Sequence, residues 1–140
     1  MTSSNPQKTV NKPLRIALWI VQVLLAFSFG ISGVMKSTMP IAELAKNIPW
    51  TPEVPVALVR FIGVAELAGA AGLILPAVTR ILPGLTALAG AGLTVVMILA
   101  TGFNLNRGKP AEAGATVVLA ALAAFVAWGR YKKAPIRSRA

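Results

Sequence analysis

The chain has 140 residues, of which 56% are hydrophobic and only 13% are charged. A typical soluble domain has about a quarter of its residues charged, so this composition excludes an ordinary water-soluble fold. The net charge of +10 does not indicate a nucleic-acid-binding protein, because the basic residues flank apolar blocks instead of alternating with polar or aromatic readers on one soluble face.

The apolar residues are gathered into four blocks, at residues 14–34, 57–75, 81–103 and 113–128. Each block approaches the roughly 20 residues that a helix needs to cross about 30 Å of hydrocarbon. The sequence therefore predicts an all-α integral membrane protein with four spans. Its membrane domain covers residues 14–130, between a polar N-terminal tail (residues 1–13) and a basic C-terminal tail (residues 131–140).

The connection between the first and second spans is the longest, and part of it is amphipathic. Between Pro40 and Pro49, the apolar residues follow the spacing of one helix face: Ile41, Leu44, Ala45 and Ile48. Proline suits the first position of a helix and also ends one. We expect a two-turn helix lying at the membrane interface, with Trp50 as an anchor after it. A solvated loop is the alternative.

The other two connections, residues 76–80 and 104–112, are short and contain basic residues. Short connections make consecutive helices antiparallel neighbours, so the predicted architecture is an up-down-up-down four-helix bundle. Nine Lys and Arg residues fall on the side of the two termini and five on the other side. The positive-inside rule then predicts that both termini are cytoplasmic.

Glu66 lies near the middle of the second apolar block. A carboxylate at that depth costs about 3 kcal/mol, which removes most of the roughly −4.5 kcal/mol that the nine strong hydrophobes of this block contribute. The residue must therefore be paired, protonated or hydrated. Arg60 lies about 120° around the helix from Glu66, so better partners are Lys36 of the first span and Asn104 or a hydroxyl group of the third.

The up-down order brings Lys36, Arg60 and Asn104 to one side of the membrane, above Glu66. We take these four residues as candidates for a ligand or proton site. A purely structural polar clamp is the alternative role for Glu66. Small residues at helix-facing positions indicate close packing of the spans; these are Gly33, Gly63, Gly69, Gly72 and Gly90. The chain has no Cys, His or Asp, so it shows no metal site and no self-contained catalytic set.

Several sequence pieces together resemble the DoxX-like family of small bacterial membrane proteins. They are Phe29-Gly30 with Gly33-Val34-Met35-Lys36, Arg60-Phe61-Ile62-Gly63 with Glu66, Arg107-Gly108, and Trp128-Gly129-Arg130. The resemblance implies a four-span bundle in the bacterial inner membrane, with relatives associated with thiosulfate:quinone oxidoreduction and membrane redox complexes. Asn104 departs from the pattern, because family members often carry His there.

Two functions follow as hypotheses. The first is an accessory or binding component of membrane redox processes, whose ligand is a small lipophilic molecule such as a quinone, or another membrane protein. The second is a small proton-coupled transporter that uses Glu66. No cofactor is evident from the residues themselves. The expected surroundings are membrane lipids, and nucleic acid is not an expected partner. The sequence does not specify the oligomeric state.

Overall fold

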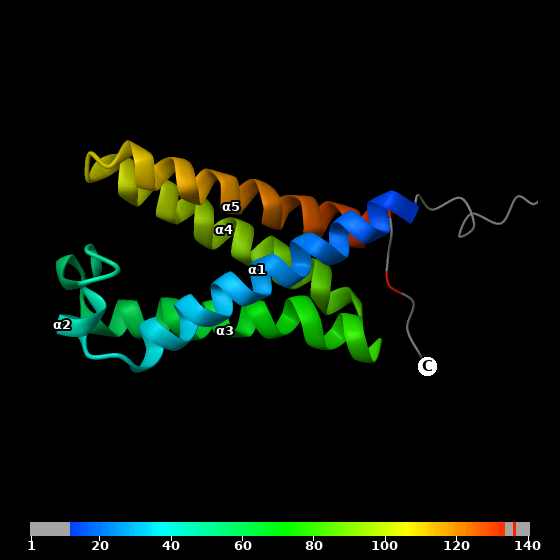
Figure 1. Ribbon diagram of the computed structural model, residues 1–140, viewed down its shortest axis with the longest axis horizontal. Coiled ribbons are helices and arrows are strands. Elements are labelled where there is room, and N and C mark those ends of the chain that lie inside the picture. The colour runs from blue at the N-terminus through cyan, green and yellow to red at the C-terminus, as the bar shows by residue number, and fades with distance from the viewer. Residues whose placement is uncertain (1–11, 134–135, 137–140) are drawn as a thin grey trace, which may run out of the picture.

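The computed structural model describes residues 12–133 and 136, and these form helices and loops without a strand (Figure 1). Four helices are long and apolar enough to cross a membrane. They are α1 (Lys12–Thr38), α3 (Val56–Thr79), α4 (Gly84–Asn106) and α5 (Pro110–Trp128). The predicted all-α bundle with four spans is confirmed, and the protein is a multi-pass membrane protein by the length and composition of its helices.

All four helices extend beyond the predicted apolar blocks, and two of them reach into the segments predicted to be tails. Helix α1 begins at Lys12, inside the segment predicted to be a polar tail, and residues 1–11 of that tail lie outside the described residues. Helix α5 continues into a π-helical turn, Gly129–Lys133. This turn includes the start of the predicted basic tail, and apart from Ile136 the remainder of that tail also lies outside the described residues.

The turn between α3 and α4 comes later in the chain than predicted. Pro76 was expected to end the second span, but it is buried inside α3, and the third span begins at Gly84 instead of Ile81. The reversal is made by Arg80 and Leu82, whose φ angles are 58° and 49°. Membrane helices accommodate an interior proline because neighbouring helices supply hydrogen bonds for the freed backbone groups.

The connection between α1 and α3 contains less helix than predicted. Helix α2 (Ile41–Leu44) is a single turn, so the predicted two-turn helix ending at Pro49 is wrong in length. Hydrogen bonds from the Asn47 and Ile48 amides to the Leu44 carbonyl continue the winding, and a 3-10 turn follows at Thr51–Glu53. The Leu44 side chain is fully buried. The connection therefore buries at least one of its own apolar side chains.

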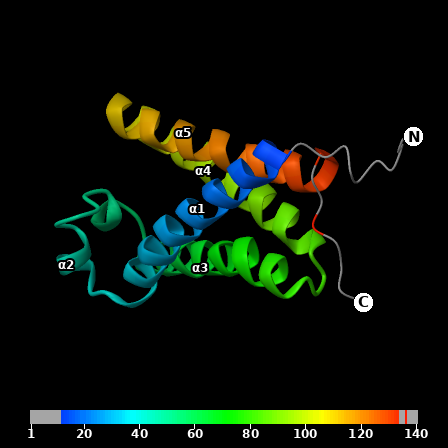
Figure 2. The same ribbon diagram turned by 45° about the vertical axis from the view of Figure 1, so that its right-hand side comes forward.

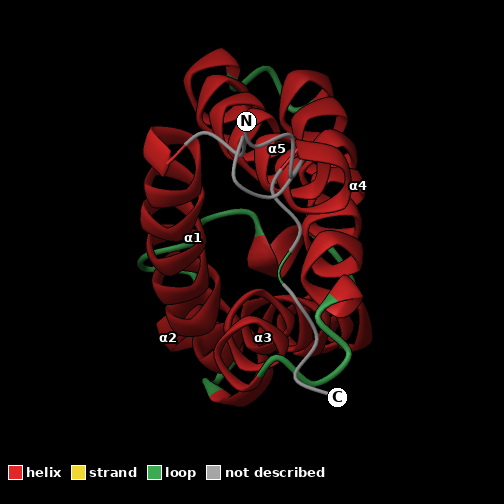
Figure 3. Ribbon diagram, turned by 90° about the vertical axis from the view of Figure 1, so that its right-hand side faces the viewer, coloured by secondary structure: helices red, strands yellow, loops and turns green. Residues whose placement is uncertain are grey.

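The four helices surround a common core, as the view along the bundle shows (Figure 3). Helix α1 packs along α3 and α4 packs along α5, while the contact of α3 with α4 joins the two pairs (Figure 2). The contact between α1 and α5 is much smaller. All four helices contribute to the buried apolar cluster, which consists of Leu25, Phe29, Ala70, Leu73, Leu93, Met97, Ala123 and Val126. Large apolar side chains such as Phe27, Phe61 and Leu99 point outward, as a bilayer requires.

The five glycines named from the sequence lie where two helices approach closely. A Cβ atom on Gly63 would come within 2.7 Å of the Ser37 amide nitrogen, and one on Gly33 within 2.8 Å of the Gly63 carbonyl oxygen. The other three meet side chains or backbone of the neighbouring helix at 2.6 to 3.0 Å: Gly69 at Leu93, Gly72 at Ala89, and Gly90 at Ala123 and Ala127. Small residues thus allow the backbones to touch.

Replacing Gly63 by Ala should lower the stability of the bundle, because the new methyl group would overlap the backbone of α1. Overpacking of this kind costs about 1–3 kcal/mol. Gly92→Ala is the matched control, since a Cβ atom there has no neighbour within 4 Å. Its effect should be neutral or slightly stabilising, because alanine favours a helix by up to about 1 kcal/mol over glycine. Thermal unfolding in detergent measures both, and equal midpoints would contradict the close approach of α1 and α3.

Candidate functional site

Glu66 and Lys36 form an ion pair inside the bundle. The Lys36 ammonium donates to Glu66 Oε2 at 3.1 Å, and the Ser32 hydroxyl donates to Glu66 Oε1 at 2.9 Å. The side chains are almost fully buried, with 10% of Lys36 and 2% of Glu66 exposed. Each carboxylate oxygen has a donor, which is what a charge in an apolar medium requires.

The position of this pair follows from the packing of α1 on α3. Lys36 lies in the last turn of α1, and Ser32 lies one turn earlier. Gly33, between them, lies against Gly63 of α3, so the two backbones come close enough for the side chains to meet. Of the partners considered for Glu66 from the sequence, the structure brings Lys36 to it and adds Ser32, which the sequence analysis did not single out.

Arg60 lies beside this pair without joining it. Its Nη1 atom donates to the carbonyl oxygens of Lys36 at 3.0 Å and Met39 at 2.6 Å. These carbonyls belong to the C-terminal end of α1, where helix carbonyls have no partner within their own helix and the helix dipole is negative. The guanidinium thus stabilises the end of α1. Within the described residues no hydrogen bond or ion pair joins Arg60 to Glu66, as their separation around α3 implies.

Trp50 covers the Lys36 side chain. The ammonium lies 5.3 Å from the centre of the indole ring, within the range of a cation–π interaction. The same ring meets Phe103 of α4 edge-on, with 5.5 Å between centroids. Trp50 was expected to be an anchor at the membrane interface, and in the structure it contacts both halves of the bundle, through Lys36 of α1 and Phe103 of α4. The α1–α3 connection therefore forms a cover over the ion pair.

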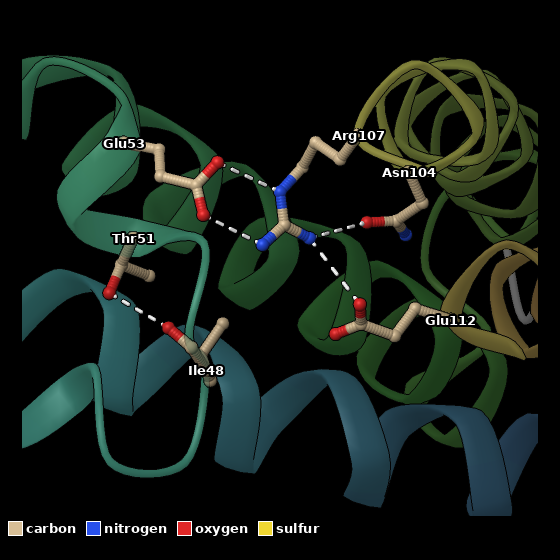
Figure 4. Close-up of polar contacts among 6 residues, drawn as sticks. All are labelled: Ile48, Thr51, Glu53, Asn104, Arg107 and Glu112. Atoms are coloured by element: carbon tan, nitrogen blue, oxygen red, sulfur yellow. Dashed lines mark hydrogen bonds and ion pairs between the residues drawn. The ribbon is translucent and has the colours of Figure 1, made fainter. Parts of the chain in front are cut away.

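A second set of polar contacts ties this cover to the α4–α5 turn (Figure 4). Arg107 donates through Nε and Nη2 to the two carboxylate oxygens of Glu53, at 3.0 and 2.8 Å. Its Nη1 atom lies 3.4 Å from both Asn104 Oδ1 and Glu112 Oε2. The hydrogen bond from Arg107 lowers the pKa of Glu53 below its usual value, and the pKa of Arg107 is raised by the same bond.

Asn104, proposed as a partner of Glu66, belongs to this Arg107 network instead. It is buried and accepts from Arg107, and within the described residues no hydrogen bond joins it to Lys36 or Glu66. The sequence analysis did not select Glu53 or Arg107 as site residues. Arg107 was visible as part of a family-like motif, but Glu53 gave no signal because only the path of the connection brings it to Arg107.

The opposite end of the bundle holds another buried polar group. Arg130 donates through Nε to the Gln22 side-chain oxygen at 2.6 Å, and Gln22 donates to the Leu73 carbonyl at 2.7 Å. The Arg130 guanidinium also lies 5.5 Å from the Trp19 ring. From the sequence, Arg130 was counted among the basic residues that flank the last apolar block, and in the structure its side chain is buried. The sequence signal for this buried polar contact was Gln22, a polar residue inside the first apolar block.

The described residues contain no group of three or more His, Cys, Asp or Glu side chains that could hold a metal ion. The chemistry available at the loop-covered end is therefore that of a buried ammonium, a carboxylate and a hydroxyl. These groups can donate hydrogen bonds, accept them and hold a proton.

Comparison with known protein families decides what kind of protein this is. The model of the DoxX-like family matches residues 20–126, which include the Lys36–Glu66 pair and the Arg107 network. The chain belongs to the DoxX-like family. Comparisons with curated proteins and with solved structures gave no match. The matched region of this DoxX-like protein ends before Arg130, so the contact of Arg130 with Gln22 lies partly outside it.

Removing one member of the buried pair should destabilise this DoxX-like protein. Lys36→Met leaves Glu66 without its countercharge, a loss that costs about 3–5 kcal/mol when a buried pair is broken. The double variant Lys36→Met/Glu66→Leu should recover most of that loss. Lys46→Met is the control, because the Lys46–Glu43 pair is exposed and contributes about 1 kcal/mol or less. Unfolding in detergent measures all three, and wild-type stability of Lys36→Met would contradict the buried pairing.

The contact between Glu53 and Arg107 should weaken in acid. Because the pKa of Glu53 is lowered in the folded protein, its stabilising effect is present at neutral pH and is lost as the pH falls through the folded-state value. The protection factors of residues 45–54, which are hydrogen-exchange rates corrected for the intrinsic pH dependence of exchange, should therefore fall as the pH drops below about 5. Glu53→Gln should abolish most of this acid response, whereas Glu43→Gln, at an exposed position of the same connection, should retain it. An identical acid response in both variants would exclude Glu53 as its source.

Proposed function

We propose that this DoxX-like protein is an accessory component of a membrane redox system, and that it binds a small lipophilic molecule of the quinone class at Lys36 and Glu66. The observation that carries the proposal is the buried ion pair at membrane depth, because ionisable residues inside membrane spans usually mark ligand or proton sites. It lies directly under a connection that spans both halves of the bundle.

The residues around the pair suit an amphiphilic ligand with oxygen acceptors. Lys36 and Ser32 supply donors from one helix, and Glu66 supplies an acceptor that can also carry a proton. Gly33 and Phe29 lie one and two turns below Lys36 on the same buried face of α1. A polar head at the ion pair would therefore have its apolar part among apolar helix faces.

Access to the pair requires movement of the cover. Two surface grooves, one along α3 and one between α4 and α5, include neither Lys36 nor Glu66 in their walls. Trp50 lies over the Lys36 ammonium, and Glu53 holds the connection to Arg107. Release of these two contacts would open a path from the loop-covered end.

The chain's own contribution is binding and proton exchange. It has no Cys or His for a thiol relay or a His-ligated haem, so we assign electron transfer to a partner membrane protein. The transporter alternative is less well supported, because Lys36 already neutralises Glu66 and occupies the place of a cationic substrate. We further propose that the protein lies in the bacterial inner membrane with both termini cytoplasmic, which places the cover on the outer side.

Lys36→Met and Glu66→Gln should each weaken the binding of a short-chain quinone analogue to the purified protein. Loss of a hydrogen bond from a charged group corresponds to about a tenfold weaker affinity. Lys46→Met, which removes an exposed lysine, should bind like the wild type. Calorimetry in detergent, on variants whose folding is checked by thermal unfolding, measures the affinities. Equal affinities in folded variants would place the ligand elsewhere, and absence of binding to the wild type would reject the quinone class.

A further inference from the structure

The outer face of α3 carries a groove whose only charged residue is Arg60. The groove has a volume of about 450 Å³ and is lined by Ala57, Arg60, Phe61, Val64, Ala65 and Ala68. Phe61 and Val64 are about 60% exposed, so the groove opens toward the lipid and away from the bundle core. Apart from Arg60, its walls are alanine, valine and phenylalanine, with no other polar side chain.

The guanidinium of Arg60 is held in place from one side only. Both of its hydrogen bonds leave from Nη1 and end on the Lys36 and Met39 carbonyls of α1. Within the described residues, Nε and Nη2 form no hydrogen bond, and no carboxylate forms an ion pair with Arg60. The Nε–Nη2 edge is a fork of two parallel donors, whose geometry matches a carboxylate or a phosphate.

Arg107 is an example in the same chain of an Nε–Nη2 edge that binds a carboxylate. Arg107 turns its Nη1 atom to Asn104 and Glu112, and its Nε and Nη2 atoms hold both oxygens of Glu53. Arg60 likewise uses Nη1 for hydrogen bonds within the protein. Within the described residues, however, no carboxylate lies against its Nε and Nη2 atoms as Glu53 does in Arg107. A fixed guanidinium with an open fork favours a bidentate oxyanion from outside the chain.

The length of the groove indicates what kind of molecule carries the oxyanion. Ala57 and Ala68 are eleven residues apart, which corresponds to about 16 Å along a helix. That is about half of the roughly 30 Å hydrocarbon thickness, or one leaflet. Arg60 lies near the loop-covered end of the groove and the apolar residues continue toward the middle of the span. A soluble phosphate or carboxylate would fill only the Arg60 end.

We propose that this groove binds one anionic phospholipid of the leaflet at the loop-covered end. The Nε–Nη2 edge of Arg60 holds the phosphate, and one acyl chain lies along Phe61, Val64 and Ala68. An anionic headgroup is favoured over a zwitterionic one because it brings no ammonium group to compete with the guanidinium. This site is separate from the Lys36–Glu66 pair, and it does not depend on the function proposed for that pair.

Native mass spectrometry with added lipids tests the site, using phosphatidylglycerol and phosphatidylcholine of identical acyl chains. The wild type should bind the first phosphatidylglycerol more tightly than phosphatidylcholine. Arg60→Met should weaken that first binding by about fivefold or more, which is the effect of one basic residue at a lipid surface. Arg80→Met is the matched control, because it removes the same charge from an exposed turn at the other end of α3 and should leave the first binding unchanged.

Arg60 also stabilises the end of α1, so a second variant keeps its hydrogen bonds intact. Ala68→Trp fills the apolar end of the groove, and it should weaken long-chain phosphatidylglycerol while leaving a dihexanoyl analogue unaffected. Equal losses in Arg60→Met and Arg80→Met would overturn the proposal in favour of general surface charge. Equal binding of the two lipid classes by the wild type, or unchanged long-chain binding in Ala68→Trp, would overturn it as well.

Discussion

A carboxylate inside an apolar helix is the constraint on which most of this structure depends. Glu66 is stable at its depth only if donors reach both of its oxygens, and α1 supplies both from Ser32 and Lys36. For these two donors to reach Glu66, α1 must extend to Lys36 and must lie against α3 with almost no side chain between the two backbones. Gly33 and Gly63 meet this requirement, so the close helix pair and the buried charge are two aspects of one arrangement.

The two halves of the bundle are joined differently at their two ends. At the loop-covered end, the connection between α1 and α3 crosses to α4 and is held there by Glu53 on Arg107 and Trp50 on Phe103. At the other end, Arg130 and Gln22 link α5 to α1 and α3 directly. Between them the helices share an apolar core, which is as compatible with lipid as with protein and so gives little specificity. The polar contacts at the ends add specificity to the pairing that the short connections and the glycine contacts already favour.

The sequence predicts the features that depend on helix period and membrane thickness. The four spans and the separation of Arg60 from Glu66 both follow from spacing along a helix. Pro76 and the length of α2 were misjudged because tertiary contacts, including the burial of Leu44, override local helix signals there. Glu53 and Arg130 were missed or misassigned because their partners are fixed by the path of a loop and by a π-helical turn, which leave no periodic signal. Asn104 was misassigned because its side chain accepts from Arg107, three residues later, and not from the groups around Glu66.

The contact between Gln22 and Arg130 also has a consequence for biosynthesis. The two residues are 108 positions apart, whereas Lys36 and Glu66 are separated by only 30. During translation the hairpin of α1 and α3 can therefore acquire its ion pair before α5 has left the ribosome. The side-chain oxygen of Gln22 has no hydrogen bond from Arg130 until α5 and the turn after it have been inserted. A chain that stops before Arg130 would leave the Gln22 side-chain oxygen inside the bundle without this donor.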